Sequence, residues 1–196
     1  MTAKGINRAV FLDRDGTISP DKFGYIRDPK LYHLYPETGA ALRIFQALGY
    51  RIIIVTNQSG IARAYLSLAE LEAVHQKMRE LIALEGVTVD GVYFAPYHIE
   101  GIVAPFNINH EDRKPGIGMY KRARQDFDID PVRSFMIGDR ATDIGFAKNA
   151  GLVSILLKTG NGAGEMSELL ASESLRPDYI AENILAAAQL IQRFYP

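Results

Sequence analysis

Residues Arg8–Thr17 have the sequence RAVFLDRDGT, in which a short apolar run passes directly into a polar turn. A continuous run of β-branched, aliphatic and aromatic side chains, bounded by turn residues, is typical of a strand buried on both faces. Aspartate and glycine follow at once, and both residue types favour a sharp turn. We therefore expect a strand over residues 8–12 that places acidic side chains at its carboxyl end.

Short apolar runs followed by polar turns recur along the chain. The predicted strands are Arg8–Leu12, Arg51–Val55, Gly91–Phe94, Ser134–Ile137, Val153–Leu157 and a shorter one at Tyr179–Ile180. Helical spacing of apolar residues predicts helices at Glu37–Leu48, from Ser67 to about Leu84, and at Met119–Phe127, Thr142–Ala150 and Ile184–Phe194. Strands that alternate with helices predict an α/β fold with a mostly parallel sheet. We expect a single Rossmann-like three-layer domain over residues 1–196.

Composition limits the classes of function. The chain has 196 residues, a formal net charge of −1 and no cysteine. This charge gives no general electrostatic reason to bind nucleic acid or an anionic membrane. Without cysteine there is neither a disulfide nor a thiolate nucleophile. The N-terminus shows no secretory signal and no apolar run reaches the roughly 18 residues of a membrane span, so we expect a cytoplasmic protein. We also expect a monomer.

Four polar clusters follow strands or open helices. They are FLDRDGT at residues 11–17, VTNQSG at 55–60, RKPG at 113–116 and GDRATD at 138–143. In open parallel sheets, ligands bind beyond the carboxyl ends of the strands. All four clusters are expected at that edge, so they should form one site.

The chemistry of the clusters is complementary. Asp13, Asp15, Asp139 and Asp143 are acidic, and such a group is costly to assemble unless a cation lies within it. Oxygen ligands without histidine or cysteine suit magnesium. Lysine, arginine and threonine from the other clusters would complement an anion. Together, these groups suit the transfer of a phosphoryl group.

The clusters resemble the four motifs of the haloacid dehalogenase superfamily. These are Asp-x-Asp-Gly-Thr after the first strand, Thr after the second, an isolated Lys, and Gly-Asp-x-x-x-Asp after a later strand. The resemblance covers nearly the whole chain. It implies that Asp13 is the nucleophile, forming an aspartyl-phosphate, and that Asp15 is the general acid and then the general base.

The resemblance also implies the remaining roles at the centre of the site. Thr56 and Lys114 would hold the transferring phosphoryl group. Asp13, the backbone carbonyl of Asp15, and Asp139 would bind Mg²⁺, with Asp143 supporting these ligands from behind. The intervals between the motifs are too short for a separate cap domain, so we expect an open site whose loops set specificity.

Within the superfamily, the strings FLDRDGT, GYI, VTNQSGIAR and RKPGIGM are similar to those of D-glycero-D-manno-heptose 1,7-bisphosphate phosphatases and the related histidinol-phosphate phosphatases. The similarity implies a small phosphorylated molecule as substrate. The implied substrate contacts are Asp21, Lys22, Phe23, Gly24, Tyr25, Thr56, Asn57, Gln58, Ser59, Arg113, Lys114 and Arg140.

One departure from that family concerns a zinc loop, Cys-x-His followed by Cys-x-Cys. The matching positions here are Ala95, Tyr97, His110 and Asp112. We therefore expect no structural zinc and a 95–112 loop held by packing and hydrogen bonds. A different metal on His98, His110 and Asp112 stays an alternative, although this spacing matches no standard metal motif.

Two further readings stay open beside a heptose bisphosphate phosphatase. One is a phosphatase for histidinol phosphate or another small phosphate. The other is a non-catalytic scaffold that retains the fold and binds a partner. A nucleic-acid 3′-phosphatase is disfavoured, because no basic stripe is visible.

Overall fold

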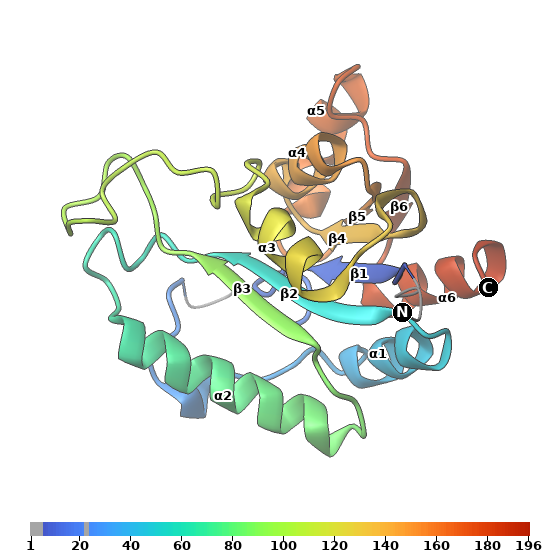
Figure 1. The fold of residues 1–196 in the computed structure, drawn as a ribbon, viewed down its shortest axis with the longest axis horizontal. Helices are drawn as coiled ribbons and strands as arrows, with labels where there is room; N and C mark the ends of the chain where they lie inside the picture. Colours follow the sequence, from blue (N-terminus) through green and yellow to red (C-terminus); the bar gives the residue numbers. More distant parts are fainter. Residues whose placement is uncertain (1–5, 22–23) are drawn as a thin grey trace, which may run out of the picture.

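The computed structural model describes residues 6–21 and 24–196. Within these residues the chain forms one sheet of six parallel strands in the order β3-β2-β1-β4-β5-β6 (Figure 1). The strands are β1 Ala9–Leu12, β2 Arg51–Asn57, β3 Gly91–Ala95, β4 Phe135–Gly138, β5 Val153–Leu157 and β6 Tyr179–Ala181. The predicted fold class, α/β with a parallel sheet between helices, is confirmed.

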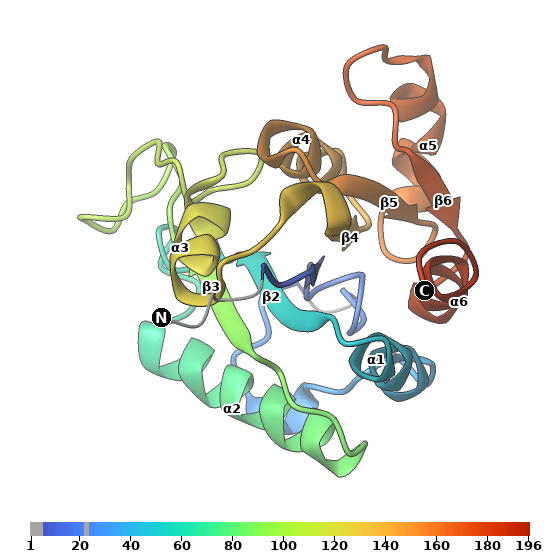
Figure 2. The same cartoon turned by 45° about the vertical axis from the view of Figure 1, so that its right-hand side comes forward.

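Helices cover both faces of the sheet (Figure 2). They are α1 Thr38–Ala47, α2 Leu68–Leu84, α3 Gly118–Phe127, α4 Ala141–Ala150, α5 Gly162–Ala171 and α6 Ile184–Phe194, with short 3₁₀ turns at Pro29–Leu31 and Pro131–Arg133. Helices α1, α2 and α6 pack on one face, and α3 and α4 pack on the other. Among the described residues, no helix has the length and apolar character needed to cross a bilayer.

The alternation of side chains along β1 shows why the strand is apolar throughout. Val10 and Leu12 join the core under α1, α2 and α6, whereas Ala9 and Phe11 join the core under α3 and α4. Successive side chains of a strand point to opposite faces, so a central strand covered on both faces needs apolar residues at every position. Burial of these side chains removes apolar area from water and stabilises the fold.

The order of the strands decides where a site can form. From β1 the chain proceeds outward through β2 to β3, and then crosses to β4 and proceeds outward on the other side. A crevice opens at the carboxyl ends of the strands where the direction of winding changes. Here that point lies between β1 and β4, which are the strands that Asp13 and Asp139 follow.

The structure differs from the sequence-based prediction most clearly at two places, and several other predicted ends differ by one residue. Helix α5 was not predicted, because two of its first three residues are glycine, a poor helix former. Packing explains the glycine at Gly162, where a Cβ would lie 1.7 Å from the backbone oxygen of Leu157. Strand β2 also runs two residues beyond the predicted end, because Thr56 and Asn57 still pair with β3.

His75 is a buried histidine of α2 whose Nε2 atom has no hydrogen-bond partner in the described residues. Its ring lies 5.7 Å from that of Phe94, centroid to centroid. Burial, reinforced by the positive charges of Arg14 and Arg79, lowers the pKa of His75 to about 3. The native state therefore keeps His75 neutral under conditions in which an exposed histidine is charged.

This depressed pKa predicts a loss of stability in acid. Below a pH of about 6.5 the unfolded chain takes up a proton at His75, while the native state does so only near pH 3. Stability is fully present above pH 6.5 and falls between these values. In His75→Leu, the decline from pH 7 to pH 4 should be smaller by about 2–3 kcal/mol in urea unfolding.

The exposed His33 provides the matched control for this measurement. His33→Leu should keep the acid dependence of the parent protein. Parallel curves for the parent and His75→Leu would contradict the assignment of the acid loss to His75.

Candidate active site

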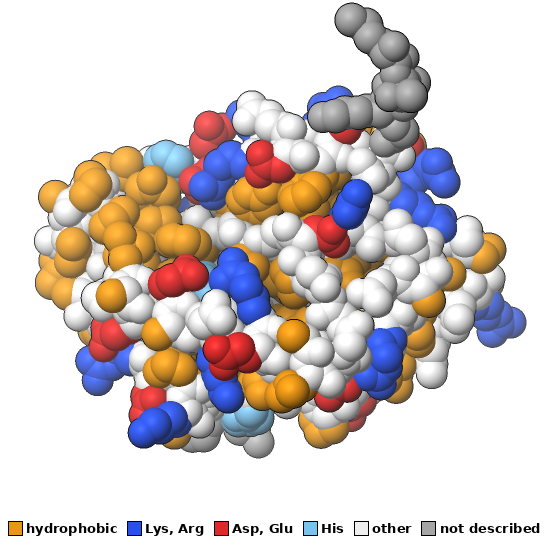
Figure 3. All heavy atoms as spheres, turned by 60° about the horizontal axis from the view of Figure 1, so that its bottom comes forward, with side chains coloured by type: hydrophobic (Ala, Val, Ile, Leu, Met, Phe, Trp, Pro, Cys, Tyr) orange, Lys and Arg blue, Asp and Glu red, His pale blue; other side chains and the backbone are white. Residues whose placement is uncertain are grey.

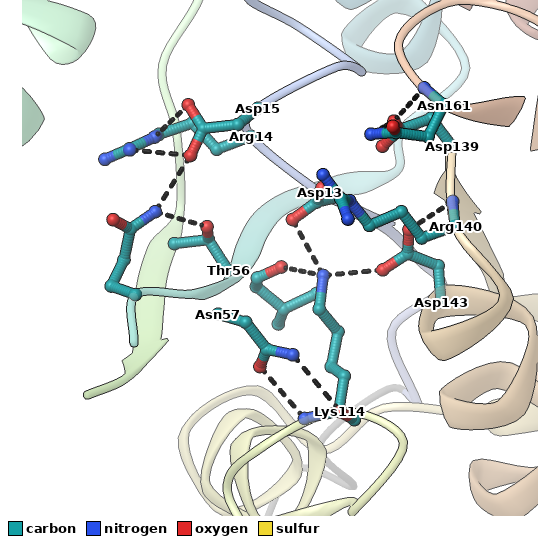
Figure 4. A network of polar contacts seen from close by, with 12 residues as sticks. Asp13, Arg14, Asp15, Thr56, Asn57, Lys114, Asp139, Arg140, Asp143 and Asn161 are labelled. Atoms are coloured by element: carbon teal, nitrogen blue, oxygen red, sulfur yellow. Dashed lines mark hydrogen bonds and ion pairs between the residues drawn. The ribbon is translucent and has the colours of Figure 1, made fainter. Parts of the chain in front are cut away.

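Three carboxylates from separate turns converge at the carboxyl edge of the sheet (Figure 4). Asp13 follows β1, Asp139 follows β4, and Asp143 lies in the first turn of α4. One oxygen of each lies within 4.8 Å of the others, and all three residues are buried. Buried like charges at this separation repel one another strongly, so the cluster requires positive charge nearby.

Lys114 supplies part of that charge. Its ammonium group lies 2.7 Å from Oδ1 of Asp13 and 2.6 Å from Oδ1 of Asp143, and it donates to the backbone oxygen of Val55 at 2.8 Å. Burial alone would lower the pKa of Lys114, but the two carboxylates outweigh it and raise the pKa. The lysine therefore stays charged although it is only 2% exposed.

Asn57 at the end of β2 fixes the backbone of Lys114. Its Oδ1 accepts from the amide of Lys114 at 3.0 Å, and its Nδ2 donates to the carbonyl of Lys114 at 3.1 Å. Asn57 is among the substrate contacts that the sequence predicts. It lines the cleft, and its amide group is engaged in locating the lysine.

Asp139 keeps one oxygen without a partner. Its Oδ2 accepts from the backbone amide of Asn161 at 2.8 Å, whereas its buried Oδ1 has no hydrogen bond within the described part of the chain. Burial, together with Asp13 and Asp143, raises the pKa of Asp139 to about 8. Burial likewise raises the pKa of Asp13 to about 7, against the opposing effect of Lys114.

The cluster therefore fits a hard divalent cation. One lysine cannot balance three carboxylates, and the free oxygen of Asp139 offers a ligand atom beside Asp13. The side-chain donors are all oxygen, which suits Mg²⁺ better than a softer metal.

Two glycines allow the turns to approach Asp139 closely. A Cβ on Gly16 would lie 2.3 Å from Oδ2 of Asp139, and one on Gly160 would lie 2.1 Å from the same oxygen. Gly16 also has a φ of +88°, which side-chain-bearing residues rarely adopt. The hydroxyl of Thr159 donates to the carbonyl of Gly16 at 2.7 Å and joins the two turns.

The turn after β5, which carries Thr159, Gly160 and Asn161, is not among the predicted site residues. A signal was present, since TGNG follows a predicted strand as the other polar clusters do. In a parallel sheet that turn must reach the same edge.

Arg14 was also missed, and it determines the environment of Asp15. Its Nε donates to Oδ1 of Asp15 at 2.9 Å and its Nη2 donates to Oδ2 at 2.7 Å. The Nε2 of Gln58 donates to the same Oδ2 at 2.9 Å and to the hydroxyl of Thr56 at 2.9 Å. Burial would raise the pKa of Asp15, but the guanidinium and these hydrogen bonds outweigh it and lower the pKa.

A cleft of about 360 Å³ opens above these groups. Its lining includes Asp13, Asp15, Asp21, Gly24, Tyr25, Thr56, Asn57, Gln58, Ser59, Arg113, Lys114, Arg140 and Asp143. Arg140 forms an ion pair with Asp21 at 2.8 Å, and Tyr25 shares a hydrogen bond of 2.9 Å with Ser59. Two expected substrate contacts, Lys22 and Phe23, lie outside the described residues.

The loop between β3 and α3 borders the cleft, and packing holds it together. The rings of Tyr97 and His110 stack with centroids 3.9 Å apart, at two of the positions where the resemblance would place zinc ligands. Within the loop, His98 donates its backbone amide to Phe106 at 3.0 Å. The amide of Ile102 donates to the carbonyl of Ala62 at 2.7 Å, which ties the loop to the turn after β2.

Two of the three residues of the alternative metal site lie close together, since Nδ1 of His110 is 3.7 Å from Oδ2 of Asp112. Asp112 also pairs with Arg122 at 3.2 Å. Of all described acidic and histidine side chains, only Asp13, Asp139 and Asp143 form a group of three close enough for an ion. Three isoleucines of the loop, Ile99, Ile102 and Ile108, are exposed, and apolar side chains gather on this side of the molecule in Figure 3.

Comparison with known proteins places the chain in a family. A family model described as "HAD-hyrolase-like", after haloacid dehalogenase, matches residues 112–187. A D-glycero-D-manno-heptose-1,7-bisphosphate 7-phosphatase of Thermosynechococcus vestitus is 40% identical over 187 residues, covering 93% of this chain and 94% of the relative. The D-glycero-beta-D-manno-heptose-1,7-bisphosphate 7-phosphatase of Haemophilus influenzae is 33% identical, covering 96% and 98%.

A solved structure agrees with these relatives. The D,D-heptose 1,7-bisphosphate phosphatase of B. bronchiseptica, complexed with magnesium and phosphate, superposes with a TM-score of 0.82. It is 29% identical, and the match covers 95% of this chain and 99% of that one. The chain therefore belongs to the haloacid dehalogenase-like hydrolases and, within them, to the family of the heptose bisphosphate phosphatases.

Proposed function

We propose that this chain hydrolyses a phosphate monoester of a sugar, with D-glycero-D-manno-heptose 1,7-bisphosphate as its first candidate substrate. The observation that carries the proposal is the position of Asp13. Its carboxylate touches the ammonium group of Lys114 and lies beside the free oxygen of Asp139, at the floor of an open cleft. A nucleophile, a fixed positive charge and a cation site therefore lie next to one another, as phosphoryl transfer requires.

Asp13 attacks first. One of its carboxylate oxygens bonds to phosphorus while the bond from phosphorus to the sugar oxygen breaks, which leaves an aspartyl-phosphate. Lys114 and the hydroxyl of Thr56 hold the phosphoryl oxygens. Because these two groups are fixed in place before the reaction, they need not reorient as charge develops in the transition state. Lys114 is already located for this task by Asn57.

Asp15 transfers the protons. It gives a proton to the departing sugar oxygen and later takes one from the water that attacks phosphorus and releases phosphate. In the resting protein its lowered pKa keeps it charged. The negative charge of an entering phosphate favours uptake of a proton by Asp15, and Asp15 then donates this proton to the sugar oxygen.

Mg²⁺ would balance the negative charge of the three carboxylates that Lys114 leaves uncompensated. Asp13, the backbone carbonyl of Asp15, and Asp139 would hold it, and when bound it would neutralise negative charge on the phosphoryl group. Asp143 accepts from the backbone amide of Arg140 at 3.0 Å and pairs with Lys114, which suits a supporting role.

The rim of the cleft suits a second anionic group on the substrate. Arg113 is half-buried there, and Arg140 lies at the same cleft. Burial, with Arg63 and Arg140 nearby, lowers the pKa of Arg113, so an anion entering between these groups relieves their mutual repulsion. A sugar bisphosphate would supply one phosphate for the floor and another for the rim.

The nucleophile is tested by Asp13→Asn. The amide cannot form the acyl phosphate, so phosphate release from heptose 1,7-bisphosphate should fall by about 10⁴-fold or more. Asp128→Asn is the matched control, since Asp128 is exposed and has a φ of 49° that asparagine tolerates. An inactive parent with Mg²⁺ supplied would favour a scaffold, and a higher kcat/KM on histidinol phosphate would move the assignment to that substrate.

The cation site is tested by thermal unfolding of Asp139→Asn. In EDTA the variant should unfold at a higher temperature than the parent, because it removes a carboxyl group whose raised pKa of about 8 in the native state lowers stability at neutral pH. With Mg²⁺ at 100 times its Kd, the parent should gain about 5–10 °C and the variant almost nothing. Equal gains in both proteins would contradict a site that includes Asp139.

A further inference from the structure

Arg14 is a large, deeply buried side chain that the proposed reaction does not use. It is 1% exposed, and its guanidinium lies 5.8 Å from the centre of the Tyr32 ring. Taking a guanidinium out of water is costly unless its hydrogen bonds are well made. Its one charged partner among the described residues is Asp15, which itself lines the cleft.

The geometry of this pair constrains the Asp15 carboxylate closely. The two donors of Arg14 form a planar fork that takes one oxygen each, so the fork fixes the plane of the carboxylate. Gln58 adds a third donor on Oδ2. A carboxylate has about four acceptor positions, so one stays open for a proton.

Gln58 also links Asp15 to the phosphate end of the site. The same Nε2 that donates to Asp15 donates to Thr56 Oγ1. Gln58 is 2% exposed and has little room to turn toward a substrate. The amide group of Gln58 thereby sets the separation between the carboxylate of Asp15 and the hydroxyl of Thr56.

A purely structural role does not explain why the buried side chain at position 14 is charged. The turn that carries Asp13 and Asp15 is held by the backbone of Arg14, whose carbonyl accepts from the amides of Ile18 at 3.0 Å and Ser19 at 3.1 Å. The hydroxyl of Ser19 donates to that carbonyl as well, at 3.1 Å. An apolar side chain at position 14 could keep these backbone bonds without burying a charge.

We propose that Arg14 and Gln58 are positioning residues for proton transfer by Asp15, with Arg14 fixing the plane of the carboxylate and Gln58 fixing its distance from Thr56. This inference rests on the proposed function, in which Asp15 is the acid and base. As the phosphorus–oxygen bond breaks, the proton moves from Asp15 to the sugar oxygen, which leaves as an alcohol. In the second half the carboxylate regains a proton from the attacking water, whose oxygen bonds to phosphorus as the bond to Asp13 breaks.

The proposal predicts a dependence on the leaving group. A sugar alkoxide is strongly basic and needs the proton, whereas 4-nitrophenolate leaves without one. Arg14→Met and Gln58→Leu should therefore lower the first-turnover rate of heptose monophosphate formation from heptose 1,7-bisphosphate by about 10²-fold, the cost of a misplaced catalytic group. Both should keep the first-turnover rate of 4-nitrophenol release from 4-nitrophenyl phosphate within about threefold of the parent, since the nucleophile and Lys114 are untouched. The first turnover is measured because the later hydrolysis of the aspartyl-phosphate also uses Asp15 and is common to both substrates.

Matched variants separate this inference from the proposed function. Asp13→Asn should lose both first-turnover reactions, and Asp15→Asn should lose the first turnover of the sugar phosphate preferentially; failure of either overturns the proposed roles themselves. Arg14→Lys keeps the charge but not the fork, and it should stay nearer to Arg14→Met than to the parent. Arg133→Met, at an exposed arginine, should change neither activity.

Equal losses of the first-turnover rate on both substrates in Arg14→Met and Gln58→Leu would show a structural role and overturn the inference, as would unchanged first-turnover rates on both. Should Arg14→Met fail to fold, as judged by circular dichroism, Gln58→Leu decides the question by the same ratio of activities.

Discussion

The contact on which the rest of the site depends is the one between the ammonium group of Lys114 and the carboxylates of Asp13 and Asp143. Three acidic side chains lie together in a water-poor place, and without this lysine their repulsion would oppose the approach of the turns after β1 and β4. The surrounding fold keeps the lysine in place through Asn57 and the carbonyl of Val55. The remaining negative charge is left for a cation and then a substrate. The acidic cluster therefore lowers folding stability at the same place where it supplies the groups for the reaction.

Much of this arrangement could be predicted from the sequence. A continuous apolar strand and its polar turn recur, and a parallel sheet brings such turns to one edge, so the meeting of Asp13, Lys114 and Asp139 follows from topology. Side-chain partners were harder to predict. Asn57 and Gln58 are expected substrate contacts that line the cleft, and the hydrogen bonds of their amide groups to Lys114 and Asp15 could not be predicted. Which way an amide points depends on neighbours tens of residues away, and local pattern carries no such information.

The misses have a common physical origin. Helix α5 begins with glycines that are unfavourable for a helix, yet close packing against Leu157 requires one of them. Arg14 stands between two acidic residues, where a charged residue suggests an exposed turn, yet its side chain is buried by its pairing with Asp15. In both cases tertiary contacts reverse the preference that the residue type shows by itself.

The loop between β3 and α3 shows a different consequence of composition. Its form depends on the stacked rings of Tyr97 and His110 and on backbone hydrogen bonds such as that from Ile102 to Ala62. None of these contacts involves sulfur, and the chain has no cysteine at all. Peroxide, thiol-alkylating reagents and soft heavy metals therefore find no thiolate to attack beside the cleft. The border of this active site therefore has no thiolate whose oxidation could release the loop.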